Sequence, residues 1–236
     1  MPNSTLVITI TEDWSRKEIF ISLTIIPRLL MTQYRKITEK ITGKLNPKQA
    51  YLFYCLALKS DFNTDLSHIK QDTLAEFYGI KKTDQIREWL KQFKELGLVG
   101  IDKTDEKGKF GKFNRCHYLL NTEHFVLITD KLHSENISNE LKGFLILLKC
   151  KCLNGTNTTL YSQNQLAEEL NISTGSISKY MKLAIDNGYI KKDKKGIHLL
   201  REDIFKITKE TEIGIMKCVY PSIITDEDIA NGRIMP

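Results

Sequence analysis

The sequence lacks several features that would assign it to common protein classes. Its apolar runs, such as 144–148, fall far short of the roughly 20 residues that a membrane-spanning helix needs. The first residues, 1–11, lack the basic start and long apolar stretch of a secretory signal. The five cysteines are odd in number and scattered, which argues against a disulfide framework. We therefore expect a cytoplasmic protein with reduced thiols and no membrane contact.

Signatures of catalysis and metal binding are also missing. There is no glycine-rich phosphate loop and no dinucleotide fingerprint. Cys150 and Cys152 have no second Cys or His pair at zinc spacing. Cys116 and His117 are neighbours on an expected strand and so face opposite sides. The remaining histidines are scattered, so we expect no enzyme active site, no catalytic residue, no metal and no cofactor.

Length and charge leave room for a binding protein. The chain has 236 residues, enough for two domains of roughly 80 to 100 residues each. Its formal net charge is +6, a modest basic excess that fits a polyanionic partner without proving one. The location of the basic residues along the chain therefore has to decide whether the partner is a polyanion.

An internal repeat organises the chain. Residues 74–76 and 166–168 both read Leu-Ala-Glu, and the LGLV of 96–99 corresponds to the NGYI of 187–190. The offset between the copies is 92 residues at the start and 91 at the end. The two copies therefore differ in length by one residue, in the turn before Ile86.

Each copy predicts a helix-turn-helix. Gly79 and Asn171 are placed to end the first helix, since both tolerate the positive φ of a C-cap. The polar stretches 81–84 and 173–176 are placed to cap the second helix. Helical spacing predicts that the second helices bury Ile86, Trp89, Leu90 and Phe93 in one copy, and Ile177, Tyr180, Met181 and Leu183 or Ala184 in the other.

The flanks of the two copies are also alike. An apolar helix is expected before each copy, at 47–59 and 138–152. After each copy come an extended segment, a basic tip with glycine and a second extended segment. These three parts are expected at 98–102, 103–111 and 112–120 in the first copy, and at 189–191, 192–196 and 197–200 in the second. Three helices followed by a hairpin is the winged-helix order.

The stretch LAEELNISTGSISKYMKLAIDNGYI closely resembles winged helix-turn-helix segments of bacterial and phage DNA-binding proteins. Two such units in one chain resemble plasmid and phage replication initiators with paired winged helices. This resemblance implies a mainly α protein with small β wings (α+β), built from two tandem winged helix-turn-helix domains. The expected divisions are an N-terminal extension at 1–45, a first domain at 46–122, a connector at 123–137, a second domain at 138–202 and a C-terminal extension at 203–236.

The N-terminal extension has its own pattern. Segments 6–10 and 18–26 are rich in strand-forming residues, and 29–41 has the pattern of a helix. The extension is either an elaboration that packs on the first domain or a dimerisation element. We favour the first interpretation, and a homodimer stays open.

The second helix of each turn is expected to enter the major groove of double-stranded DNA, with the wing on the backbone. Arg87 suits guanine, because a guanidinium donates to two acceptors, and Gln85 suits adenine. Asp84 and Glu88 weaken this patch. The outward-facing candidates of the first copy are Lys81, Lys82, Thr83, Gln85, Arg87 and Lys91.

The second copy offers the better DNA-facing helix, because its small, hydroxyl-bearing residues let a phosphate come close. Its wing, 191–196, is lysine-rich and is expected to contact phosphates. The candidates here are Ser173, Thr174, Ser176, Ser178, Lys179, Lys182, Lys192, Lys194 and Lys195.

Three functions fit these features. The first is sequence-specific DNA binding that initiates replication of a plasmid or mobile element. The second is transcription regulation by a dimeric winged helix on a palindromic operator. The third is a scaffold whose winged helices bind protein. Related scaffold subunits of chromosome condensation tend to be acidic, so the basic charge of this chain favours DNA.

Overall fold

The computed structural model describes residues 4–13, 18–27, 34–108, 111–153 and 156–206. The chain divides into two compact units, 1–33 and 34–236. In the first unit, β1 (Ser4–Asp13) and β2 (Glu18–Pro27) form an antiparallel hairpin in continuous register. This confirms the two strands expected there. Residues 207–236 of the expected C-terminal extension lie outside the described residues.

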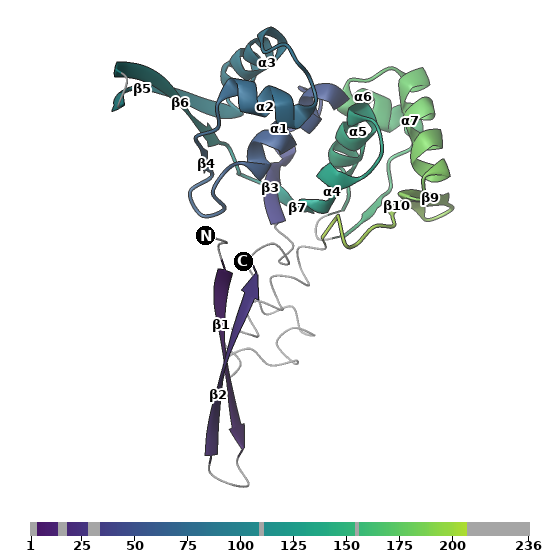
Figure 1. Ribbon diagram of the computed structural model, residues 1–236. Helices are drawn as coiled ribbons and strands as arrows, with labels where there is room; N and C mark the ends of the chain where they lie inside the picture. Colours follow the sequence, from purple (N-terminus) through teal and green to yellow (C-terminus); the bar gives the residue numbers. More distant parts are fainter. Residues whose placement is uncertain (1–3, 14–17, 28–33, 109–110, 154–155, 207–236) are drawn as a thin grey trace. The chain divides into compact units, whose positions relative to one another are not determined.

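The second unit contains the same order of elements twice (Figure 1). What we call the first repeat consists of α1 (Pro47–Leu58), β4 (Leu66–Ser67), α2 (Gln71–Tyr78), α3 (Asp84–Glu95), β5 (Val99–Gly108) and β6 (Gly111–Leu120). The second repeat consists of α5 (Asn139–Lys149), β8 (Thr158–Thr159), α6 (Gln163–Leu170), α7 (Thr174–Asp186), β9 (Ile190–Asp193) and β10 (Gly196–Leu199). The sheets correspond as well, in the orders β4-β6-β5 and β8-β10-β9.

Local sequence explains where the helices begin and end. Asn46 caps α1 in a capping box with Gln49, and Ser162 caps α6 in the same way. The α2 helix ends at Gly79 with φ 94°, and α6 ends at Asn171 with φ 53°, as the C-cap argument predicts.

The first copy departs from the expected cap. Thr83 precedes α3 but makes no side-chain hydrogen bond to the helix, whereas the Ser173 side chain accepts a hydrogen bond from the Ser176 N–H at the start of α7. The reason is conformational. Thr83 has helical backbone angles, whereas an N-cap residue needs an extended backbone to turn its side chain towards the next turn.

A further sheet lies outside the repeats. Strand β3 (Tyr34–Thr38) pairs with β7 (Phe125–Thr129), so the helix expected at 29–41 is wrong over the five residues of β3. A short 3-10 helix, η2 (Glu39–Ile41), follows β3. Phe205 bridges to Ile128 of β7 and is fully buried, although we expected it in an extension. Pairing across some 90 residues overrides the local helical pattern in 34–38.

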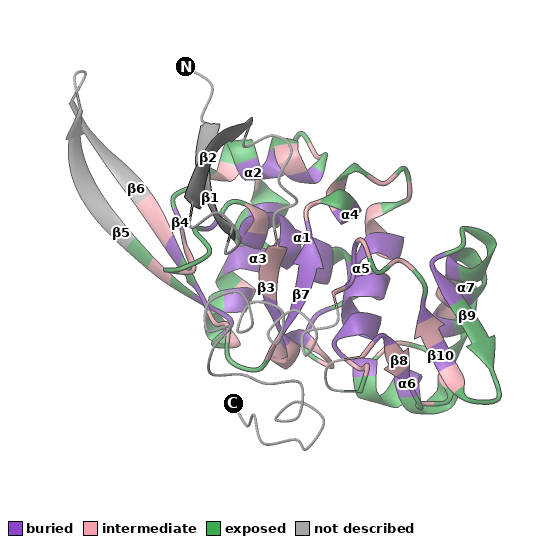
Figure 2. Cartoon of the chain, turned by 90° about the horizontal axis from the view of Figure 1, so that it is seen from below, coloured by how far each residue is buried: buried purple, intermediate pink, exposed green. Residues whose placement is uncertain are grey.

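The core runs without interruption through both repeats. Helices α1 and α5 lie between the two helix-turn-helix pairs, and both are drawn almost entirely as buried (Figure 2). Helix α5 also buries two lysines, Lys142 and Lys149. The Lys149 ammonium donates to the carbonyl of Thr156 and to the side chain of Asn157, and burial lowers its pKa. Hydrogen-bonded carbonyls thus satisfy this cation inside the core.

Candidate nucleic-acid interface

Helix α7 places one face in the core and leaves the other to solvent. Ile177, Met181 and Ala184 are buried as expected, which selects Ala184 over Leu183, whereas Tyr180, also expected in the core, is only half-buried. The predicted DNA-facing residues lie on the other side. Thr174, Ser178, Lys179 and Lys182 are exposed, and Ser173 and Ser176 stand at the helix start.

The start of α7 is shaped by its two serines. The Ser173 hydroxyl donates to the Ser176 hydroxyl at 2.9 Å and accepts from the Ser176 N–H. Both hydroxyls therefore serve the helix cap in the free protein, while Thr174 and Ser178 make no such bond in the same turn. An N-terminus with unpaired N–H groups and no acidic side chain in its first turn suits a phosphate.

The hairpin after α7 carries the basic residues. Strands β9 and β10 pair in register, and the turn between them is Lys194–Lys195, shorter than the tip that we expected. Lys192 therefore lies on β9 rather than in the turn. Lys192, Lys194 and Lys195 are all exposed.

Asp193 gives the turn its shape. Its carboxylate accepts a hydrogen bond from the Lys195 N–H at 2.7 Å and contacts the His198 ring at 3.0 Å. These hydrogen bonds, that of His198 first, hold the pKa of Asp193 below its usual range. The one acidic residue of the lysine run is thus tied to the hairpin, which the sequence pattern did not indicate.

The base of the same hairpin is anchored to the segment before α5. Arg201 donates to the carboxylates of Asp203 and Glu135, each at 2.9 Å, and Tyr189 donates to Glu135 at 2.6 Å. The Arg201 hydrogen bonds lower the pKa of Asp203 to about 2. Burial and the bond to Glu135 raise the pKa of Tyr189 to about 12. This network ties the base of the hairpin to the segment before α5.

Helix α3 has the expected core face but a balanced surface. Ile86, Trp89, Leu90 and Phe93 are buried, as predicted. On its surface the basic residues Arg87, Lys91 and Lys94 are matched by Asp84, Glu88 and Glu95. The segment from α7 to β10, by contrast, contains six lysines and only two acidic residues, Asp186 and Asp193.

Arg87 is held by neighbours in the free protein. Its guanidinium donates to Gln71 and to Asp84, both at 3.2 Å, while 58% of its side chain stays exposed. Lys91 pairs with Glu95 at 3.8 Å. Lys81, Lys82 and Gln85 are exposed and Thr83 is half-buried, so four of the six first-copy candidates lie at the start of α3, whereas Lys91 lies in its second half. These two bonds use the Nε and Nη1 donors of Arg87, and the Nη2 group makes neither of them.

The first repeat has a longer hairpin than expected. Strands β5 and β6 pair from Val99–Leu120 to Gly108–Gly111, so the strands extend through most of the segment that we assigned to the tip. Near its base, His68 and His117 lie with their Nδ1 atoms 2.6 Å apart. We had treated His68 as scattered and His117 only as the strand neighbour of Cys116, and the β4-β6 pairing brings the two histidines together.

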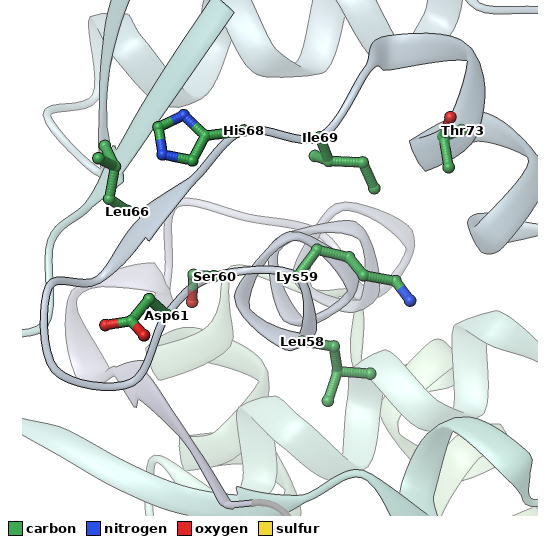
Figure 3. A pocket seen from close by; sticks show the side chains of 8 residues that line it. All are labelled: Leu58, Lys59, Ser60, Asp61, Leu66, His68, Ile69 and Thr73. Carbon is green, nitrogen blue, oxygen red and sulfur yellow. The ribbon is translucent and has the colours of Figure 1, made fainter. Parts of the chain in front are cut away.

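His68 also lines a cavity of about 470 Å³ between the end of α1, β4 and α2. In Figure 3 the Lys59 ammonium points away from both Asp61 and His68. The charged groups of the cavity thus do not converge on one point. Among the described residues, no group of three or more His, Cys, Asp or Glu side chains is placed to hold a metal ion.

The comparison with protein families bears on the second repeat. A family model described as winged helix-turn-helix DNA-binding matches residues 161–191. Residues 161–191 are a winged helix-turn-helix DNA-binding domain. The match spans α6, α7 and the first two residues of β9, and the wing lysines Lys192, Lys194 and Lys195 follow it directly. No curated protein matches the chain.

The lengths and compositions of the described helices bear on whether any of them could span a membrane. Within the described part of the chain, no helix is both long and apolar enough to cross a membrane.

Proposed function

We propose that this chain binds double-stranded DNA sequence-specifically through both repeats, as two tandem winged-helix domains, and initiates replication of a plasmid or mobile element. The observation that carries the proposal is the family match to α6 and α7 together with the lysine-rich hairpin after them. The first repeat has the same element order and sheet order, which supports a second DNA-reading unit.

Differences between the repeats favour initiation over repression. The exposed face of α3 offers Gln85 and Arg87, whereas that of α7 offers small hydroxyl residues and lysines. Two unlike helices in one chain read an asymmetric site. Several copies of a protein that assemble side by side on DNA occupy asymmetric sites arranged as direct repeats. Initiation at an origin requires such an assembly. A symmetric dimer on a palindrome, as in a repressor, needs no second, different reading helix.

A DNA selection tests this proposal. Purified protein is incubated with sheared DNA from its own source at about 50 mM salt, where backbone contacts are strongest, and the retained fragments are sequenced. Clustered direct repeats are the expected result. A lone inverted repeat beside a promoter would make the chain a transcription regulator. No enrichment would favour a protein-binding scaffold.

A further inference from the structure

The first helices of the two repeats, α1 and α5, pack directly against each other. Gly143 of α5 lies directly against Pro47, the first residue of α1. A Cβ atom at this position would lie 1.7 Å from the Pro47 carbonyl oxygen, where no side chain fits. Every residue from Gln49 to Ala57 in α1 and from Leu141 to Lys149 in α5 is buried. We call this pair of helices the spine.

Polar contacts tie the second reading helix to the spine. Glu140 of α5 pairs with Lys48 of α1 at 2.9 Å and accepts a hydrogen bond from Tyr180 of α7 at 3.5 Å. The Tyr180 ring also stacks on Phe144 of α5, with centroids 5.3 Å apart. Helix α7 is thus linked through one carboxylate to the start of α1.

Contacts on either side of the spine join the repeats again. The Asn139 side chain at the start of α5 donates to the Tyr78 carbonyl at the end of α2 at 2.8 Å. Within the second repeat, Lys151, just after α5, pairs with Glu169 of α6 at 2.7 Å. The carbonyl of the same Glu169 lies close to Gly43, in the segment that leads into α1. Tandem domains usually meet through small polar interfaces and move relative to each other, and this interface is apolar and continuous.

We propose that the spine holds α3 and α7 in one rigid body, so that the spacing between two DNA half-sites is itself read by the protein. This inference rests on the proposed function, because it needs both helices to contact DNA. In B-DNA one helical turn takes about 10 to 10.5 base pairs and about 34 to 36 Å. Five inserted base pairs therefore turn one half-site to the opposite side of the duplex.

Spacer variation in the natural site is the first test. Base pairs are inserted between the two footprints of a fragment recovered by the selection, and affinity of the wild-type chain is measured for each spacer. Five inserted base pairs should lower the affinity for the whole site at least about tenfold, down to the affinity for a single half-site. Ten inserted base pairs should not restore the lost affinity, because a rigid body cannot reach a half-site that lies one full DNA turn further away. Equal affinity at all spacers, or a footprint on one half-site only, would overturn the inference.

An unfolding experiment tests rigidity without DNA. Hydrogen exchange in increasing urea reports α3 and α7 separately. One rigid body predicts that both lose protection at the same urea concentration, and two separated transitions would overturn the inference even if the chain binds DNA. If the selection retains no DNA, the proposed function fails, and this experiment still decides the rigidity.

Substitutions locate the cause. Gly143→Ala should lower the urea midpoint strongly, whereas Gly175→Ala, where an added Cβ meets nothing within 4 Å, should keep or raise it. Glu140→Gln removes the charge that Lys48 faces and retains an acceptor for Tyr180. Because this ion pair is largely exposed and the interface is apolar, we expect the variant to bind a single half-site normally and to shift the urea midpoint far less than Gly143→Ala does. An unchanged midpoint in Gly143→Ala would refute the spine.

Discussion

The hairpin after α7 allows a quantitative test of how the chain meets DNA. Lys192 lies on β9, and Lys194 and Lys195 form the turn, all three exposed. We predict that changing the three to alanine weakens binding to every DNA sequence alike. The reason is that lysines on a wing neutralise phosphates, which are the same in all sequences.

The expected magnitude follows from counterion release. Each phosphate contact contributes about 0.9 to the slope of log affinity against log salt concentration, so three contacts contribute about 2.7. Between 50 and 200 mM salt, a slope difference of about 2.7 changes the ratio of wild-type to variant affinity by roughly 40-fold. The ratio is larger at low salt. Fluorescence anisotropy with labelled duplexes over this range measures both slopes.

A matched variant separates contact from net charge. Lys44, Lys59 and Lys70 are exposed and lie outside the predicted reading helices and wing. Their triple alanine variant loses the same formal charge and should keep nearly the wild-type slope. Parallel salt lines for wild type and the wing variant, or equal flattening in both variants, would refute the assignment of the wing to the DNA backbone.

Three further predictions follow from single side chains. Arg87→Ala should cost about 1–3 kcal/mol of discrimination at one base pair and little elsewhere, measured with a panel of single-base variants of the site; a loss equal for all sequences would contradict base reading. Ser173→Ala should lower the free energy of unfolding by about 1 kcal/mol in urea, whereas Thr83→Ala should cost much less, because Thr83 makes no cap bond. Burial, with the charges of Lys142 and Lys59, lowers the pKa of His133, so the folded state holds this ring neutral. Stability should therefore fall as pH drops below about 6.5, where the unfolded histidine takes up a proton, and His133→Gln should remove that part of the acid dependence.

Local signals in the sequence predicted the repeated parts well. Gly79 and Asn171 mark the ends of α2 and α6, and the apolar spacing in α3 and α7 gives the buried faces. These features depend on residues a few positions apart, which is the range over which periodicity and capping act. The family match to residues 161–191 falls on the same part of the chain.

Features that depend on distant pairing were not predicted. Residues 34–38 form a strand because β7, some 90 residues later, supplies the partner. His68 and His117 meet only through the β4-β6 pairing. The candidate site shows the same limit. Exposure of its residues could be read from helical spacing, but the bonds that hold Arg87 to Gln71 and Asp84 could not.

The sequence did carry a signal for the spine. A first helix that is exposed on one side should show polar residues at helical spacing, yet the α1 stretch QAYLFYCLA and the α5 stretch GFLILL have almost none. Helices that are apolar all round must be covered all round. Gly143, a poor helix former within α5, marks the point where the other helix comes close. Each repeat thus buries part of the apolar surface of the other. Separating the repeats would expose α1 and α5 to water on a side that carries almost no polar residues. A chain built this way holds its two helix-turn-helix pairs together as one piece.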